Sequence, residues 1–192
     1  MLHIQAKAIL PTAFGNFKII AFAQDEDEKM PLLLLQSERK PAEIPLVRLH
    51  SECMTGDTFS SYRCDCGEQL HRSLEMINET GGYLLYLRQE GRGIGLINKL
   101  KAYELQEEGF NTLEANQHLG FKGDEREYAE AVEVLKSMGI TSIQLITNNP
   151  DKVKYLQDHQ IEVVERIPLI IPANKNNRRY LEAKKDKMGH WL

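Results

Sequence analysis

The chain has 192 residues, of which 42% are hydrophobic and 27% are charged, so it can bury a core. Its formal net charge of −4 argues against broad capture of nucleic acid, and we expect no nucleic-acid partner. No apolar run is long enough to span a membrane, and the first residues do not form a secretion signal. We therefore expect a cytoplasmic globular protein with no membrane partner.

The first fifty residues are predicted to be extended, because short apolar or alternating runs are separated by turn residues. The acidic run 25–28 is predicted to be a solvated connection between two of them. The predicted strands are 3–9, 17–23, 31–36 and 44–50.

Helices and strands alternate in the remainder of the chain. A first helix carries Leu70, Leu74 and Ile77 on one face and ends at Gly81-Gly82. The further predicted elements are a strand over 83–87, a helix with Leu96, Leu100 and Tyr103 on one face, a helix from Tyr128 to Met138, a strand over 142–147, a short helix after Asn149-Pro150, a strand over 161–166 and a basic helical tail from Asn176. This alternation predicts an α/β fold, a single domain over residues 1–192 with a mixed sheet covered by helices.

All three cysteines of the chain, Cys53, Cys64 and Cys66, lie within one short segment. An odd number without an export signal argues against a disulfide framework. Charged neighbours such as Arg63 and Asp65 favour an exposed loop over a core strand. Clustered soft ligands at short spacing are typical of a zinc site, and we favour metal binding over core packing.

The number of ligands would decide what this zinc does. If His50 were a fourth ligand, the site would be closed and structural; with three cysteines alone, a position would remain for a reactive water. The spacing leaves both alternatives open. The pattern His50-Ser51-Glu52 resembles zinc nucleoside deaminases, but the P-C-x-x-C segment of those enzymes is absent.

Two junctions between a strand and a helix could hold an anion. The first contains Gly91, Gly93 and Gly95 between arginines; it is either a simple turn or a phosphate site, and it matches neither the Walker A nor the Rossmann spacing. The second begins a helix at Asn149-Pro150 and places Lys152 one turn further on. The residues alone therefore predict a zinc enzyme that acts on a phosphorylated small molecule.

Several long blocks resemble GTP cyclohydrolase II of riboflavin biosynthesis. They are RLHSECMTGDTFSSYRCDCGEQL, YLRQEGRGIGLINKLKAYELQ, EANQHLGFKGDERE, TNNPDKV and YLEAKKDKMGH, in this order across nearly the whole chain. The resemblance implies a three-layer α/β/α domain with a mixed sheet and a homodimer. The length of the chain leads us to expect the stand-alone form, without a dihydroxybutanone-phosphate synthase domain.

The resemblance also implies a reaction. This family opens the imidazole ring of GTP, releases formate and pyrophosphate, and forms a diaminopyrimidinone that carries ribose 5′-phosphate. It uses Zn²⁺ held by three cysteines, which match Cys53, Cys64 and Cys66, and Mg²⁺ on the triphosphate. His50 would then lie near the site without closing it. A regulatory relative that only binds zinc and nucleotide, or a paralogue that keeps the formyl group, is the alternative.

Catalytic roles carried over by the resemblance fall on Tyr103, which would orient water or substrate, on Asp124 as proton acceptor, and on Arg126. The family role of attack at the α-phosphate is chemically difficult for Arg126, because a guanidinium stays protonated; stabilisation of the departing pyrophosphate is easier. Glu90 could accept hydrogen bonds from guanine, and Arg92 and Lys152 could bind phosphate. The implied nucleotide contacts are Arg48, Leu49, His50, Ser51, Glu52, Gln69, Glu90, Gly91, Arg92, Thr112, Thr147 and Lys152.

Overall fold

The computed structural model describes residues 1–25, 30–122 and 124–192, so most of the predicted acidic connection, residues 26–28, lies outside the described residues. The chain divides into two compact units, each assembled from separate segments. The predicted single domain over residues 1–192 stays a prediction. The first unit comprises Met1–His50, Leu70–Arg88 and Tyr128–Leu169, and the second comprises Ser51–Gln69, Gln89–Glu127 and Ile170–Leu192.

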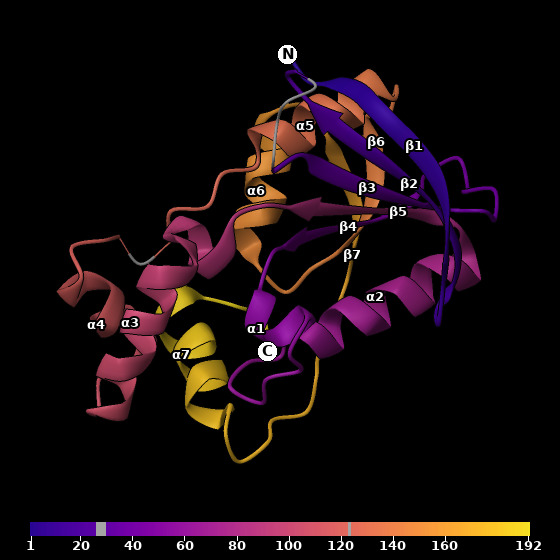
Figure 1. Ribbon diagram of the computed structural model, residues 1–192. Coiled ribbons are helices and arrows are strands. Elements are labelled where there is room, and N and C mark those ends of the chain that lie inside the picture. The colour runs from indigo at the N-terminus through magenta and orange to yellow at the C-terminus, as the bar shows by residue number, and fades with distance from the viewer. Residues whose placement is uncertain (26–29, 123) are drawn as a thin grey trace. The chain divides into compact units, whose positions relative to one another are not determined.

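The first unit is built on a seven-stranded sheet with the order β1-β2-β3-β5-β4-β6-β7 among the described residues (Figure 1). The pairs β1–β2, β2–β3 and β3–β5 are antiparallel, whereas β4–β6 and β6–β7 are parallel. The predicted mixed sheet is confirmed. The strands are β1 (His3–Thr12), β2 (Gly15–Ala23), β3 (Leu32–Ser37), β4 (Leu46–Ser51), β5 (Gly82–Leu87), β6 (Ser142–Ile146) and β7 (Glu162–Ile167).

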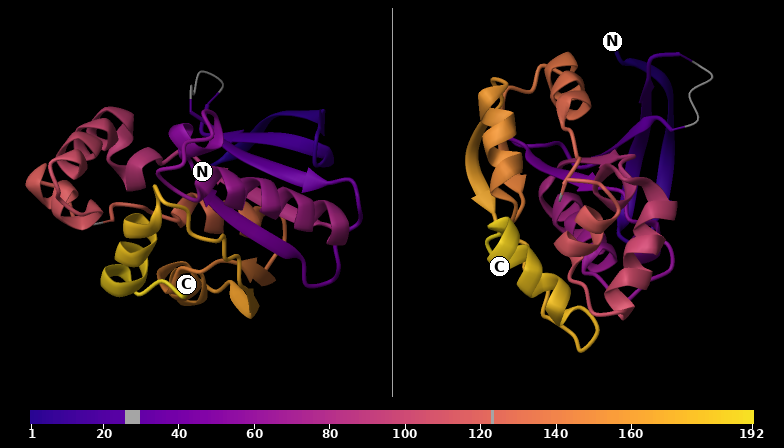
Figure 2. Two further views of the ribbon diagram at one scale, coloured as in Figure 1. Left: turned by 90° about the horizontal axis from the view of Figure 1, so that it is seen from below. Right: turned by 90° about the vertical axis from the view of Figure 1, so that its left-hand side faces the viewer.

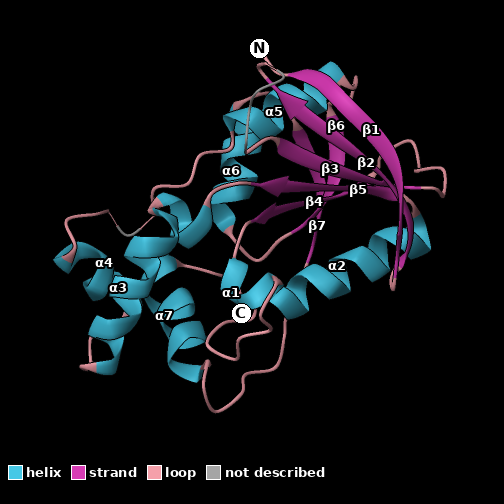
Figure 3. Cartoon of the chain, viewed as in Figure 1, coloured by secondary structure: helices cyan, strands magenta, loops and turns pink. Residues whose placement is uncertain are grey.

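Helices cover both faces of this sheet, which confirms the predicted three-layer α/β/α arrangement (Figures 2 and 3). On one face, α5 (Ala129–Ser137) and α6 (Pro150–Asp158) contribute Leu135 and Leu156 to the larger apolar cluster. On the other, α2 (Cys66–Thr80) contributes Ile77 to a second cluster. Successive strand side chains point to opposite faces, so β5 supplies Leu84 to one cluster and Leu85 to the other.

The start of one helix and the end of another in the first unit follow from the sequence. Helix α6 begins as predicted, because the Asn149 side chain accepts the Asp151 N–H at 2.9 Å and Pro150 occupies the first turn. Glycine is required at position 82, where φ is +148° and a Cβ atom would lie 2.1 Å from the Leu46 carbonyl oxygen. The Gly81-Gly82 pair, which was predicted to end α2, therefore also lies where β5 begins, in close contact with β4.

The second unit is mostly helical and departs further from expectation. Helix α3 forms as predicted, but its buried residues are Lys99 and Ala102, whereas Leu100 is exposed, so the predicted apolar face is wrong. Helix α4 was not predicted; the Asn111 side chain caps it in a reciprocal arrangement with Glu114. The elements of this unit are α1 (Met54–Asp57), the first residues of α2, the 3₁₀ turn η1 (Glu90–Gly93), α3 (Gly95–Glu107), α4 (Thr112–His118) and α7 (Arg178–Met188). None of the helices in the described part of the chain is long and apolar enough to cross a membrane.

Candidate metal centre and anion-binding groups

The three cysteines converge in the second unit. The Cys53 and Cys64 Sγ atoms are 3.7 Å apart, and the three sulfur atoms all lie within 4.8 Å of one another. Sulfur ligands bound to zinc at about 2.3 Å with tetrahedral angles would be separated by about 3.8 Å, so this set fits a zinc ion. Among the described residues the group of metal ligands contains these cysteines and no histidine, which favours the alternative with three protein ligands.

Cys53, Cys64 and Asp65 are buried, although the loop between the first two cysteines is exposed at Phe59 and Tyr62. The expectation of an exposed loop is therefore wrong for these cysteines and correct for the residues between them. Cys53 and Cys64 are each 6% exposed, and Asp65 is 1% exposed. The polar flanks were misleading because the charged neighbours are paired: the Asp65 carboxylate accepts from the Lys184 ammonium at 2.7 Å and from the Gln69 amide. Although burial alone would raise it, the pKa of Asp65 is lowered by this ammonium.

Two glycines allow the cysteines to approach one another. A Cβ atom on Gly56, in α1, would lie 2.9 Å from the Cys64 sulfur and 3.2 Å from the Cys53 sulfur. A Cβ atom on Gly67, at the start of α2, would lie 2.3 Å from the Gly56 carbonyl oxygen. Glycine is therefore needed at both positions, because α1 and the start of α2 lie in direct contact beside the cysteines.

The sulfur atoms differ in their affinity for protons. Hydrogen bonds from the Cys64 and Cys66 thiols, together with the Lys99 ammonium, lower the pKa of Cys53 far below its usual value despite burial. The same hydrogen bond to Cys53 raises the pKa of Cys64 to about 11, and the pKa of Cys66 is also raised. Cys53 is therefore the sulfur that ionises most readily, and metal binding must release the protons of the other two thiols.

A buried lysine joins the cysteines to Glu90. The Lys99 Nζ donates to the Cys53 sulfur at 3.1 Å and to Glu90 Oε1 at 2.7 Å. The Glu90 carboxylate also accepts the backbone N–H groups of Met54 and Gly91, each at 2.6 Å. Although desolvation opposes it, the charge of Cys53 raises the pKa of Lys99 well above its usual value. The ammonium therefore offsets the negative charge that three thiolates would bring to a zinc ion.

Tyr103 lies beside this cluster, as the predicted catalytic role requires. Its hydroxyl is 3.4 Å from the Thr55 hydroxyl, which in turn is 3.7 Å from the Cys53 sulfur. The Arg63 guanidinium stacks over the Tyr103 ring at 4.1 Å, and burial raises the pKa of the phenol. Tyr103 is therefore neutral near pH 7 and can donate a hydrogen bond.

The predicted proton acceptor Asp124 and the predicted phosphate residues Arg92 and Arg126 meet next to the glycine-rich turn. Arg126 Nε donates to Asp124 Oδ1 at 2.8 Å, and its Nη2 donates to the other carboxylate oxygen. Burial would raise the pKa of Asp124, but the Arg126 guanidinium lowers it. The Arg92 carbonyl accepts the Glu125 N–H at 3.0 Å, and Arg92 itself has a left-handed φ of +65°. This pairing brings Arg92, Asp124 and Arg126 together.

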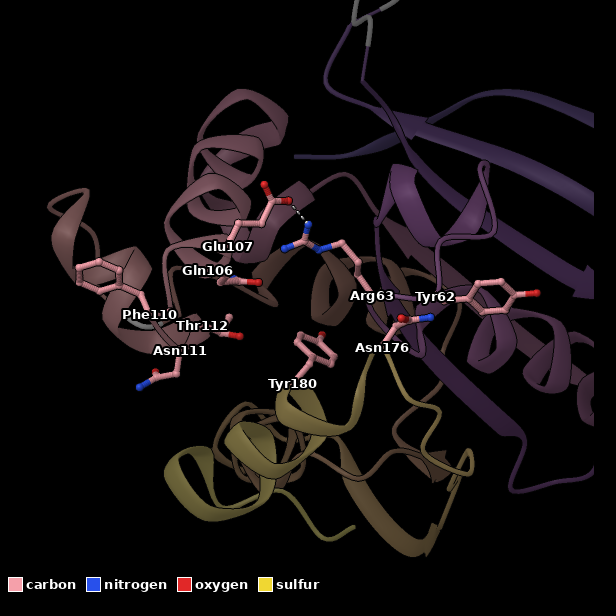
Figure 4. Close-up of a pocket in the computed structure, with 10 residues that line it drawn as sticks. Tyr62, Arg63, Gln106, Glu107, Phe110, Asn111, Thr112, Asn176 and Tyr180 are labelled. Atoms are coloured by element: carbon pink, nitrogen blue, oxygen red, sulfur yellow. Dashed lines mark hydrogen bonds and ion pairs between the residues drawn. The ribbon is translucent and has the colours of Figure 1, made fainter.

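A pocket of about 750 Å³ also lies in the second unit (Figure 4). Its wall includes Arg63, Phe110, Thr112 and Tyr180, and the close-up shows Thr112 on α4 and Tyr180 on α7. Thr112 is the first residue of the capped helix α4. This predicted nucleotide contact therefore borders an open space of ligand size.

The first unit gathers its predicted residues at the carboxyl ends of β4 and β6, where ligands bind in open α/β sheets. Arg48 Nη1 donates to the Ile146 carbonyl at 3.0 Å, and Lys152 Nζ donates to the Leu49 carbonyl at 2.7 Å. The Thr147 hydroxyl accepts the Asn149 N–H at 3.0 Å. The His50 ring stacks on Tyr86 with centroids 5.5 Å apart.

The remaining predicted contacts lie in the second unit. Ser51 accepts a hydrogen bond from the Gln89 amide at 3.0 Å, Glu52 is buried, and Gln69 is bonded to Asp65. Each of the two units thus holds its own share of the implied nucleotide contacts.

Comparison with known proteins identifies the family. A model of the family described as GTP cyclohydrolase II matches residues 3–168. The chain belongs to the GTP cyclohydrolase II family. A protein of Bacillus cereus named "Riboflavin biosynthesis protein RibBA" is 52% identical over 98% of this chain and 48% of its own length, and a protein of the same name from Bacillus mycoides is 50% identical with the same coverage. The chain spans about half the length of these curated relatives.

Among solved structures, a match is found to RibBX, "a two domain 3,4-dihydroxy-2-butanone 4-phosphate synthase from A. baumannii". It covers 88% of this chain and 40% of that chain at 16% identity, with a TM-score of 0.45. A similarity at this level bears on neither the fold nor the activity of this member of the GTP cyclohydrolase II family.

Three residues beside the cysteines were missed by the sequence analysis. Lys99, Asp65 and Lys184 are all buried and all make charged hydrogen bonds. All three lie inside blocks that resemble GTP cyclohydrolase II, but a charged residue in a polar segment carries no sign of burial. The one available signal was Lys99, which lies four residues before Tyr103 and therefore on the same helical face.

Proposed function

We propose that the protein is a zinc-dependent GTP cyclohydrolase II that opens the imidazole ring of GTP, releases formate and pyrophosphate, and catalyses the first step of riboflavin biosynthesis. The observation that carries this proposal is the convergence of three cysteine sulfurs within 4.8 Å in a chain of this family. A site with three protein ligands leaves a position for water, as a hydrolytic zinc site requires.

Cys53, Cys64 and Cys66 would hold the zinc ion. When bound there, zinc supplies a water of lowered pKa and polarises the bond that is attacked. Lys99 donates a hydrogen bond to the Cys53 sulfur at 3.1 Å. Tyr103, which reaches the same cluster through Thr55, orients water or the purine through its phenol.

Release of pyrophosphate is assigned to the Asp124–Arg126 pair and to Arg92. The guanidinium of Arg126 stays protonated, so its role is to stabilise the charge that develops on the departing phosphates. Asp124 is held as a carboxylate by Arg126 and can accept a proton only if part of this pairing is exchanged for substrate. This makes charge stabilisation by Arg126 the better-supported role.

Arg48, Leu49, His50, Thr147 and Lys152 are proposed as nucleotide contacts on the strength of the resemblance. The two cations, Arg48 and Lys152, now donate to backbone carbonyls, and both groups can also bind phosphate oxygens. Mg²⁺ on the triphosphate and a homodimeric assembly belong to the same proposal. The phosphate chemistry suits Mg²⁺, which prefers oxygen ligands of this kind.

Recognition of guanine by Glu90 stays a prediction. Its carboxylate accepts from Lys99, Met54 and Gly91, so most of its acceptor capacity is used within the protein. The variant Glu90→Gln, assayed with GTP and ATP, distinguishes the two roles. A loss of preference for GTP supports guanine recognition, whereas a loss of bound zinc with unchanged preference assigns Glu90 to the metal centre.

The deciding experiment measures formate and pyrophosphate together after incubation of the zinc-loaded protein with GTP and Mg²⁺. We expect both products in equal amounts, and none from ATP. Pyrophosphate without formate would indicate a paralogue that keeps the formyl group. Tight binding of GTP without either product would indicate a regulatory relative, and both results would overturn the proposed reaction.

A further inference from the structure

The C-terminal helix α7 contacts the metal-ligand segment through a buried ion pair. Lys184 Nζ lies 2.7 Å from the Oδ1 atom of Asp65, and Asp65 is the residue between the ligands Cys64 and Cys66. The side chains of these two residues are 11% and 1% exposed. This ion pair therefore connects α7 to the Cys64–Asp65–Cys66 segment, in which one residue separates two predicted ligands.

The Asp65 carboxylate has a second partner that fixes its orientation. The Gln69 amide donates to Oδ2, and the Gln69 N–H donates to the Asp65 carbonyl at 3.0 Å. Both carboxylate oxygens are therefore held, one by α2 and one by α7. Because Asp65 is covalently linked to Cys64 and Cys66, holding its carboxylate restrains the backbone from which both sulfur atoms project.

Local contacts at both ends of helix α7 place the residue that makes this ion pair. Asn174 and Asn177 exchange side chain to backbone hydrogen bonds at 2.7 and 3.0 Å and form the turn that begins the helix. The Tyr180 ring lies one turn before Lys184 and 4.5 Å from its ammonium. Gly189, with a left-handed φ of +63°, ends the helix. The helix that carries the ammonium therefore follows a hydrogen-bonded turn and ends at a left-handed glycine.

This contact lies beyond the segment matched by the family model, although α7 carries the block YLEAKKDKMGH that resembles the family. The match to the family ends at residue 168, whereas α7 spans Arg178–Met188. The other contacts of the cysteines, from Lys99, Thr55 and Gly56, all lie within the matched segment.

We propose that α7 is a structural part of the metal centre: the Lys184–Asp65 ion pair holds the Cys64–Asp65–Cys66 turn in the geometry that binds zinc. The inference rests on the proposed metal centre but not on turnover of GTP. Residues outside the ligand set that orient ligands commonly change metal affinity by about 10- to 100-fold when they are removed. Lys184 is accordingly a positioning residue and not a catalytic one.

Thermodynamic linkage gives a test that requires no variant. If docking of α7 favours zinc binding, zinc must favour docking of α7 by the same factor. Hydrogen–deuterium exchange of the full chain, with zinc and after chelation, should show faster exchange in peptides covering 178–188 and 53–66 after zinc is removed. Peptides from α5 in the first unit should not change. Exchange in α7 that does not respond to zinc would overturn the proposal.

Three variants test the ion pair directly, with zinc affinity measured by competition with a chromophoric chelator. Asp65→Asn and Lys184→Met should each lower zinc affinity by about 10- to 100-fold, and should alter the thiolate-to-metal absorption of the cobalt-substituted protein. The double variant, which buries no unpaired charge, should lose less than the two single effects combined. The matched control is Lys185→Met at the exposed neighbour on α7, which should stay within about twofold.

The outcomes separate this proposal from the proposed function. Single variants that fold and bind zinc as tightly as the parent would overturn the role of α7, even if the parent converts GTP. Coupling between zinc and α7 in a protein that releases no formate would support the role of α7 and reject the proposed function. If Lys184→Met does not fold, the exchange experiment on the parent chain decides.

Discussion

The two units of this protein have different interiors. Both apolar clusters lie in the first unit, where residues such as Leu135, Ile77 and Leu85 are completely buried between the sheet and its helices. The second unit buries Lys99, Lys184, Glu90 and Asp65 together with Cys53 and Cys64. The first unit is therefore stabilised by apolar burial, and the second depends on paired charges around three sulfur atoms.

This difference shows why the metal matters for one unit more than the other. Apolar burial contributes to stability without a ligand. Buried ion pairs contribute little net stability but become very unfavourable when one partner is lost. A zinc ion bound by three thiolates would supply the second unit with the stability that its small apolar content does not. Variants in each unit should therefore differ in whether they lose zinc or only stability.

Replacement of a zinc ligand should have the largest effect. Cys64→Ser removes one of three sulfur ligands, so we expect loss of bound zinc and formate release reduced to background. Zinc content measured by atomic absorption and a formate assay on the same sample test this. Full activity in a zinc-free Cys64→Ser protein would show that the cysteines do not hold the catalytic metal.

Removal of the buried ammonium at the cluster should strongly destabilise the second unit. Lys99→Met leaves the Cys53 sulfur and the Glu90 carboxylate without their shared partner, which costs about 3–5 kcal/mol. Urea unfolding followed by fluorescence of Trp191, the single tryptophan of the chain and a residue of the second unit, measures this loss. The matched control is Lys101→Met, at an exposed position on the same helix, which should change stability by no more than about 0.5 kcal/mol.

A cavity in the apolar interior should destabilise the first unit and leave the metal centre intact. Leu135→Ala removes a completely buried side chain from the larger cluster, at a cost of about 2–5 kcal/mol. Circular dichroism during urea unfolding should report the loss, while the zinc content per chain stays unchanged. Val164→Ala, at a half-exposed position on β7, serves as the control. Loss of zinc from Leu135→Ala would show that the two interiors are not independent.

The smallest effect is expected at the start of α6. Asn149→Ala removes the side chain that accepts the Asp151 N–H and should cost about 1 kcal/mol. Thermal unfolding of the variant and its parent measures the difference. A much larger effect, or a changed KM for GTP with unchanged stability, would indicate that Asn149 contacts the substrate instead of only capping the helix.

The amino-acid sequence by itself determined the elements of the first unit and pointed to the three cysteines that could hold a metal. Strand and helix periods are local properties, so β2, β5, α5 and the capped start of α6 could be predicted from residues that are neighbours in the chain. Three cysteines in one short segment likewise predicted a shared metal site without any knowledge of the fold.

Only the tertiary structure decided which charges are buried and with what they pair. Lys184 lies 119 residues from Asp65, and Lys99 lies 46 residues from Cys53, so no local pattern could relate them. The apolar face expected on α3 was wrong for the same reason: a lysine is buried there because distant carboxylate and sulfur partners compensate its charge. Burial of a charge depends on partners brought together by the fold, and those partners cannot be identified from sequence spacing.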